Sequence, residues 1–239
     1  MNKRNAVESV LVILAFGCFW GCLEAITFGG LLHSDWGVLF PYHLCPCFIM
    51  AAVFGSLVMG SALAIHKKPH LLLGIGLVAS AFCWLAVPFL PASVRSTHYA
   101  PIVASAAAAI SGSVTLAVVA SFLKRKLERS IPVRIGAGVL SALLASVLFI
   151  VVTSYAFDKA ICPDLGYGSP LPDFLGIGGI AWMAAAAVFF PLGYLLGAKL
   201  QLWLASRPVL KARCQTYQFA CLILFNCCGI ATTAWAAGL

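Results

Sequence analysis

Seven long apolar runs are the feature of this sequence that most constrains its fold. A helix rises about 1.5 Å per residue, so about 20 apolar residues cross a hydrocarbon core about 30 Å thick. The breaks between the runs hold most of the charges and many of the prolines. The sequence predicts an all-α, polytopic transmembrane bundle forming one domain over residues 1–239, with helices at about 7–32, 44–65, 71–90, 100–123, 133–156, 175–197 and 214–238.

The composition excludes a water-soluble fold. Hydrophobic residues make up 62% of the chain and charged residues 9%, whereas an average soluble domain is about 25% charged. The chain begins with the basic residues of MNKR, but the apolar run after them is longer than the core of a cleavable signal, about 7–15 residues. We therefore expect the first segment to be retained as a helix.

The distribution of basic residues predicts the orientation. With the N-terminus inside, the inner segments, which include the connections at 66–70, 124–134 and 207–213, hold 13 of the 15 Lys and Arg residues. The outer connections at 33–43, 91–99 and 158–174 hold few. Since inner loops of membrane proteins are enriched in Lys and Arg, we expect the N-terminus inside and the C-terminus outside, in a cell inner membrane. Anionic inner-leaflet lipid accounts for the net charge of +8 without nucleic acid.

The carboxylate Glu24 lies within the first apolar run, in the stretch FGCFWGCLEAITFGGLLH. On a helical wheel it falls on the same face as Gly17 and Gly21, a pair of small residues that lets another helix approach. The carboxylate is therefore predicted to point into the bundle, as intramembrane acids usually do. It lies about 12 Å from the outer end of its helix, in the outer half of the membrane.

Three interpretations of Glu24 stay open at this stage. It could line a cavity open to the outside and recognise a solute, which is the interpretation we favour. It could instead be a protonated acid bonded to Ser, Thr or backbone of a neighbouring helix. It could also relay protons. The sequence places no Lys or Arg inside a predicted apolar helix to pair with it.

Other polar and aromatic residues are candidates for the same ligand site. Trp20 and the two histidines of the first outer loop could shape the rim, while a polar turn in the fourth helix and a lone amide in the seventh could line the interior. Ser or Thr in a helix usually bonds its own backbone, and an interfacial Trp is often a belt aromatic. The candidate ligand-binding residues are Glu24, Trp20, His33, His43, Ser111 and Asn226.

A metal site at the outer rim is a further alternative. Glu24, His33, His43, Cys45 and Cys47 gather there in sequence, and their types suit a soft divalent ion. Their spacing matches no zinc pattern, because C-P-C is not C-x-x-C, so the metal stays unknown and no cofactor is predicted. A disulfide from Cys162 to Cys45 or Cys47 is also open. Most of the ten cysteines lie inside helices, where a thiol acts as a small hydrophobe.

Small residues and missing motifs complete the prediction. The alanine-rich stretches 102–114 and 180–190 are expected to pack closely against other helices. Pro191 is predicted to lie inside the sixth helix. The chain has no P-loop, no G-x-S-x-G and no H-E-x-x-H motif. We therefore expect that the protein is not an enzyme.

The stretch WGCLEAITFGGLLH, followed by GVLFPYH, resembles the substrate-binding (S) components of energy-coupling-factor transporters. The resemblance covers the first helix and the following loop, and this sequence has seven predicted helices where six is usual. It implies a compact bundle that binds a small solute from outside and docks, through small-residue faces, on a separate transmembrane subunit with ATPases. We therefore predict a solute-binding subunit for transport. The alternatives are a structural or assembly subunit of a membrane complex, and a membrane enzyme with a metal or thiol site at the outer rim.

Overall fold

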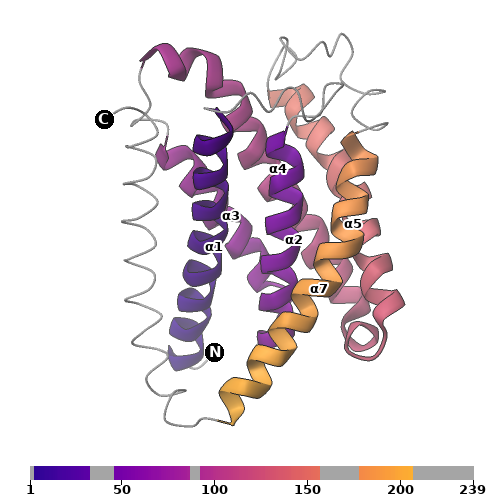
Figure 1. Cartoon of the computed structure of the whole chain (residues 1–239). Coiled ribbons are helices and arrows are strands. Elements are labelled where there is room, and N and C mark those ends of the chain that lie inside the picture. Colours follow the sequence, from indigo (N-terminus) through magenta and orange to yellow (C-terminus); the bar gives the residue numbers. More distant parts are fainter. Residues whose placement is uncertain (1–2, 33–45, 87–91, 157–177, 207–239) are drawn as a thin grey trace.

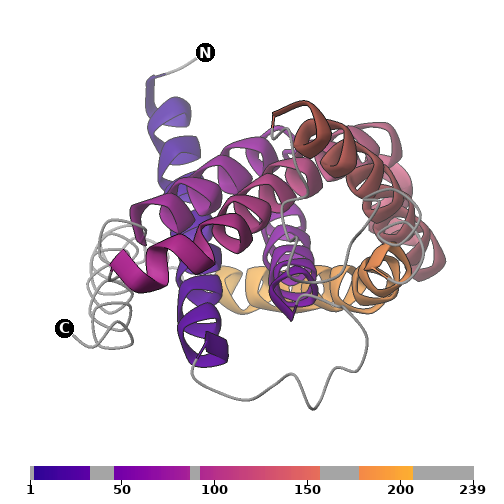
Figure 2. The ribbon, with the colours of Figure 1, turned by 90° about the horizontal axis from the view of Figure 1, so that it is seen from above.

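The computed structural model of the chain describes residues 3–32, 46–86, 92–156 and 178–206, and nearly all of these residues are helical (Figure 1). This confirms the all-α prediction for the described residues. The helices are α1 (Lys3–Leu32), α2 (Pro46–His66), α3 (Leu71–Ala86), α4 (Ala92–Arg129), α5 (Ile131–Ala156) and α7 (Gly179–Ala205). Their main contacts run from α1 through α3, α4, α5 and α7 to α2 and back to α1, which closes a bundle (Figure 2).

Five of the described helices contain a stretch long and apolar enough to cross a membrane: Ala6–Glu24, Ile49–His66, Ser105–Arg129, Ile131–Val152 and Gly179–Trp203. Helix α3 adds the shorter apolar stretch Leu71–Phe82. The protein is therefore a multi-pass membrane protein. The predicted helix at 214–238 lies outside the described residues, so the count of seven helices and the orientation of the termini stay predictions.

Helix α4 is much longer than predicted. We expected a helix over about 100–123 between loops at 91–99 and 124–134, but α4 runs from Ala92 to Arg129 and α5 begins at Ile131. Both loop predictions were wrong. At its end the helix continues through residues 124–129 because Lys, Arg, Leu and Glu are good helix formers and a helix need not stop where the hydrocarbon ends. At its start it includes residues 92–99, which we had assigned to a loop. Pro132 stands in the first turn of α5, where its missing N–H leaves no helical bond unmade.

Glycines bring α2 and α7 into backbone contact. A Cβ built on Gly193 would lie 2.2 Å from the carbonyl oxygen of Leu57, and one on Gly60 would lie 2.6 Å from that of Phe190. The hydroxyl of Ser61 spans the crossing and donates to the carbonyl of Gly193 at 2.9 Å. Pro191 lies inside α7, as predicted. Close approach of small residues is thus what joins these helices, as expected where lipid removes the hydrophobic drive to associate.

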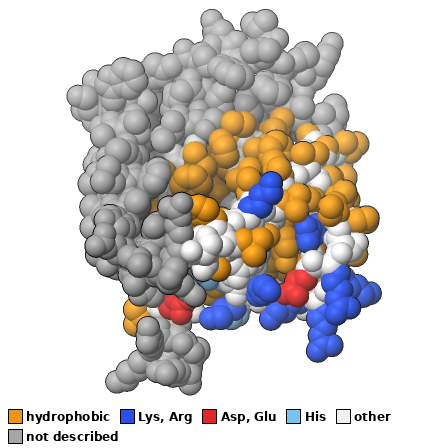
Figure 3. Space-filling view, turned by 60° about the horizontal axis from the view of Figure 1, so that its bottom comes forward, with side chains coloured by type: hydrophobic (Ala, Val, Ile, Leu, Met, Phe, Trp, Pro, Cys, Tyr) orange, Lys and Arg blue, Asp and Glu red, His pale blue; other side chains and the backbone are white. Residues whose placement is uncertain are grey.

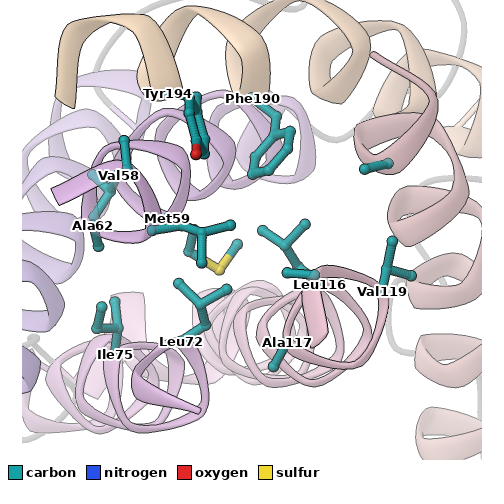
Figure 4. Packing of buried hydrophobic residues seen from close by; sticks show 14 of the residues in the cluster. Val58, Met59, Ala62, Leu72, Ile75, Leu116, Ala117, Val119, Phe190 and Tyr194 are labelled. Atoms are coloured by element: carbon teal, nitrogen blue, oxygen red, sulfur yellow. The ribbon is translucent and has the colours of Figure 1, made fainter. Parts of the chain in front are cut away.

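The main apolar core lies where α2, α3, α4 and α7 meet. In Figure 4, Met59 of α2, Leu72 of α3, Leu116 of α4 and Phe190 of α7 point into one space. Leu72 is 0% exposed and Phe190 is 1% exposed. A second, smaller cluster of mostly alanine side chains joins α5 to α7 and α4. The alanine-rich faces of α4 and α7 are therefore buried, as the sequence predicted.

Basic side chains gather at one end of the bundle (Figure 3). The chain turns there between α2 and α3, where Lys67 adopts a left-handed φ of 53° and its amine lies 3.6 Å from the carboxylate of Glu128. Arg134, which lay where the predicted connection 124–134 and the predicted helix 133–156 overlap, lies in α5 and is 8% exposed. Its guanidinium donates to the carbonyls of Leu127 and Glu128 at the end of α4. The outer face of the same end carries exposed lysines and arginines.

Candidate functional site

The small-residue face of α1 packs against α3. A Cβ on Gly17 would lie 2.6 Å from the Cβ of Val78, and one on Gly21 would lie 2.5 Å from the Cβ of Phe82. These glycines let the two helices touch along this face. The predicted packing face of α1 is confirmed. Because Glu24 lies less than one helical turn beyond Gly21, the same face carries the carboxylate into the bundle.

Glu24 is buried, with 6% of its surface exposed, and both of its oxygens accept hydrogen bonds. Trp20, one turn earlier in α1, donates its indole Nε1–H to Oε1 at 2.5 Å. Ser105 of α4 donates its hydroxyl to Oε2 at 2.8 Å. The prediction that the carboxylate points away from lipid is therefore confirmed. The second bond also ties α1 to α4, across 81 residues of sequence.

Trp20 is positioned by a glycine of a third helix. Its side chain is 1% exposed, and a Cβ on Gly55 of α2 would lie 2.6 Å from Cζ2 of its indole ring. The missing side chain at Gly55 therefore makes room for the ring. Since the indole is held between α1 and α2, its N–H is fixed in the direction of Glu24. We call Trp20, Glu24 and Ser105 the carboxylate cluster; it joins α1, α2 and α4.

The two bonds are of the kind that an ionised carboxylate accepts. A carboxylate is an acceptor at both oxygens, while a neutral acid donates from one of them. An indole N–H can only donate, so Trp20 assigns Oε1 as an acceptor. Preorganised donors of this kind offset part of the cost of holding a charge in a low-dielectric interior. The cluster therefore orients the Glu24 carboxyl group inside the bundle, with Oε1 as an acceptor.

The polar turn of α4 lies further along the helix than the cluster. Ser111 is 1% exposed, and its carbonyl accepts from the Thr115 hydroxyl at 2.8 Å. Ser113 donates to the carbonyl of Ile110 and touches α3, where a Cβ on Gly76 would lie 2.1 Å from its Oγ. Ser113 and Thr115 thus bond their own helix, and among the described residues the α4 hydroxyl that reaches Glu24 belongs to Ser105. A ligand role for Ser111 stays a prediction.

Several predicted site residues cannot be placed. His33, His43, Cys45, Cys162 and Asn226 lie outside the described residues. The described parts of the chain contain no group of three His, Cys, Asp or Glu residues that could hold a metal ion. The rim metal site and the disulfide therefore stay predictions. Two of the helical cysteines, Cys18 and Cys22, are buried in α1, as small hydrophobes are.

A small hollow lies between α2, α4, α5 and α7, away from the carboxylate cluster. It is lined by Ser56, Ser141 and Trp182 together with alanine, leucine, methionine and phenylalanine side chains. Its volume of about 20 Å³ is close to what one water molecule needs. The hollow is therefore too small for an organic solute. Ser56, Ser141 and Trp182 bring polar atoms into a lining that is otherwise apolar.

Sequence reasoning missed two residues of functional interest. Ser105 lay inside the alanine-rich stretch 102–114. Its position along the predicted fourth helix was the only sequence feature that pointed to a contact with Glu24. Arg134 counted as a basic residue of an inner segment, although it is buried and its guanidinium carbon lies 4.3 Å from the centre of the Tyr194 ring. The sequence signal for this contact was an arginine in the first turn of a helix, directly after the charged end of the preceding helix.

The fold and the carboxylate cluster together define a multi-pass membrane protein with a buried, hydrogen-bonded acid in one half of its helical bundle. No family model, no curated protein and no solved structure matches the chain.

Proposed function

We propose that the protein is a solute-binding subunit for transport across a cell inner membrane and that Glu24 is the group that recognises the solute. The observation that carries this proposal is the carboxylate cluster: Glu24 is buried, and Trp20 and Ser105 hold both of its oxygens as acceptors. An ionisable residue inside a membrane segment is costly, so it commonly marks a solute or ion pathway.

The location of the cluster supports binding from outside. Glu24 lies in the half of α1 away from Lys3, and the basic connections gather at the opposite end of the bundle (Figure 3). The positive-inside rule assigns that basic end to the cytoplasm. Glu24 then lies in the outer half of the membrane, and the chain continues from its helix into the predicted first outer loop. The resemblance of this segment to S components of energy-coupling-factor transporters agrees with such a site.

The chemistry of the cluster limits the class of solute. A carboxylate beside an indole suits a solute with a cationic group or with N–H and O–H donors. The same resemblance implies a partner, a separate transmembrane subunit with ATPases that docks on small-residue faces. The chain itself contains no P-loop motif, so the energy for transport would come from that partner.

The second candidate is a structural or assembly subunit of a membrane complex. The bond from Ser105 to Glu24 favours it, because this bond joins α1 to α4 directly. Interhelical hydrogen bonds in membranes contribute about 0.6 kcal/mol on average and up to about 1.7 kcal/mol. On this interpretation the cluster stabilises the bundle and binds no solute.

Paired variants separate the two candidates. The wild type, Glu24→Gln and the matched variant Ser105→Ala are purified from native membranes, and native mass spectrometry and thermal melting are measured on each. Solute binding predicts a small molecule that co-purifies with the wild type and with Ser105→Ala but is lost in Glu24→Gln. If no molecule is found with any of the three, and both variants lower the melting temperature alike, the solute proposal is wrong and the structural one holds.

A further inference from the structure

One face of α4 changes from apolar to cationic near the basic end of the bundle. Val118 is 48% exposed and Phe122 is 85% exposed, and the next turns carry the exposed side chains of Arg125, Lys126 and Arg129. On a helical wheel these five residues fall within about 100° of one another. We call them the α4 stripe. It lies on the outside of the bundle, so lipid is its natural neighbour.

The positive charge of the stripe is not offset by the acid in its own helix. Glu128 lies about 100° around α4 from the centre of the stripe, and its carboxylate faces Lys67 of the α2–α3 turn at 3.6 Å. Its backbone carbonyl accepts from Arg134 of α5. Glu128 is therefore engaged on the side of α4 that faces the other helices. The three cationic side chains remain available on the outer side.

The spacing along α4 matches the layers of a membrane. Arg125 lies about 4.5 Å and Arg129 about 10 Å beyond Phe122 along the helix axis. A headgroup layer is about 5–7 Å thick on each side of the hydrocarbon core. If Phe122 lies at the edge of the hydrocarbon, the backbone of Arg125 lies within the headgroup layer. The backbone of Arg129 lies about 3–5 Å beyond that layer, a distance over which its long side chain can reach back. Guanidinium groups bind phosphate through two parallel hydrogen bonds.

We propose that the α4 stripe is a binding site for an anionic phospholipid. The acyl chains lie along Val118 and Phe122, and the phosphate is bound by Arg125 and Arg129 with Lys126 beside them. Charge complementarity selects an anionic lipid over a zwitterionic one, because the site holds three cations and the acid next to it in α4, Glu128, is paired with Lys67. The site is independent of the carboxylate cluster and lies at the opposite end of the bundle.

The test compares two double variants that remove the same charge from the same end. Arg125→Gln with Arg129→Gln changes the stripe, while Lys68→Gln with Lys199→Gln changes exposed cations on other elements. Each protein is reconstituted in phosphatidylcholine nanodiscs with and without phosphatidylglycerol, and the retained lipid is measured by native mass spectrometry. Since losing each arginine that bonds the phosphate directly should weaken binding at least about fivefold, we expect at least about 30-fold weaker retention of phosphatidylglycerol in the arginine variant. The lysine variant should retain it like the wild type.

Two further measurements define the site. Phe122→Ser should weaken retention of phosphatidylglycerol while leaving all charges in place, and glycerol phosphate without acyl chains should not compete. Equal losses in the two double variants would show diffuse attraction and overturn the proposal. Equal retention of phosphatidylglycerol and phosphatidylcholine by the wild type would also overturn it. So would a melting temperature that falls in the arginine variant whatever lipid is present, because the arginines would then only stabilise the end of α4.

Discussion

The α2–α7 crossing and the carboxylate cluster hold helices together in opposite ways. At the crossing, Gly60 and Gly193 let the two backbones touch, and the hydroxyl of Ser61 bonds to carbonyl oxygens of both helices. At the carboxylate cluster, a charged or chargeable group is buried and two side-chain donors, from Trp20 and Ser105, reach it. The first contact depends on shape, and the second depends on chemistry.

The comparison shows where function can be placed in such a bundle. Where glycines touch, the contact is made by backbone, so its main contribution is to hold α2 against α7. In the carboxylate cluster, the hydrogen bonds that stabilise the contact between helices also orient an acid. A site that binds a solute can be built at the second kind of contact and not at the first.

The largest expected effect is at the crossing. Gly193→Val would place a Cβ about where the Leu57 carbonyl oxygen lies, since a built Cβ is 2.2 Å from that oxygen and 2.8 Å from the Leu57 carbonyl carbon. Backbone cannot move aside as a side chain can, so we expect a loss of more than about 3 kcal/mol in the free energy of unfolding. Unfolding in detergent micelles measures it. A loss below about 1 kcal/mol would show that the two helices do not touch here.

The next largest effect is expected at the basic end of the bundle, where a charged side chain joins two helices. Arg134→Met removes the guanidinium that bonds the last carbonyls of α4 and stacks on Tyr194. Hydrogen bonds to charged groups and cation–π contacts predict a loss of about 2 kcal/mol. Thermal melting measures it, with Lys199→Gln as the exposed control of equal charge. Equal melting temperatures of the two variants would contradict a stabilising role of Arg134 at the end of α4.

Smaller losses of stability are expected when the hydroxyls of Ser105 and Ser61 are removed, and the two losses should differ. Ser105→Ala leaves one oxygen of Glu24 without its donor, so we expect a loss of about 1 kcal/mol. Ser61→Ala removes a donor to carbonyls that still accept their own helical bonds, so its loss should be below about 0.5 kcal/mol. Both are measured by the same unfolding assay. The reverse order would mean that the crossing, and not the acid, depends on its polar bond.

The last expected effect has the opposite sign and is at a glycine whose added Cβ would meet no neighbour. A Cβ on Gly136 of α5 meets no atom within 4 Å, so Gly136→Ala has only the helix propensity to change. That favours Ala by up to about 1 kcal/mol. The melting temperature should therefore stay equal or rise slightly, in contrast to Gly193→Val. A clear fall would show that the outer face of α5 packs on something.

Much of the fold followed from single segments. The apolar runs predicted the helices, because length and hydropathy belong to each run alone. The ends of α4 were wrong for the same reason: hydropathy reports where lipid ends, while the helix continues through Lys124–Arg129 on propensity. The inward direction of Glu24 was also predictable, since Gly17 and Gly21 mark the packing face of their own helix.

The sequence by itself determined that this is a helical membrane protein, and which face of α1 carries its acid inward. Only the tertiary structure decided that Ser105 and the indole of Trp20, seated on Gly55, are what the acid meets, and that Arg134 is buried against Tyr194. The reason is geometric. A partner on another helix depends on the rotation and vertical register of both helices, and a shift of one residue turns a side chain by about 100°.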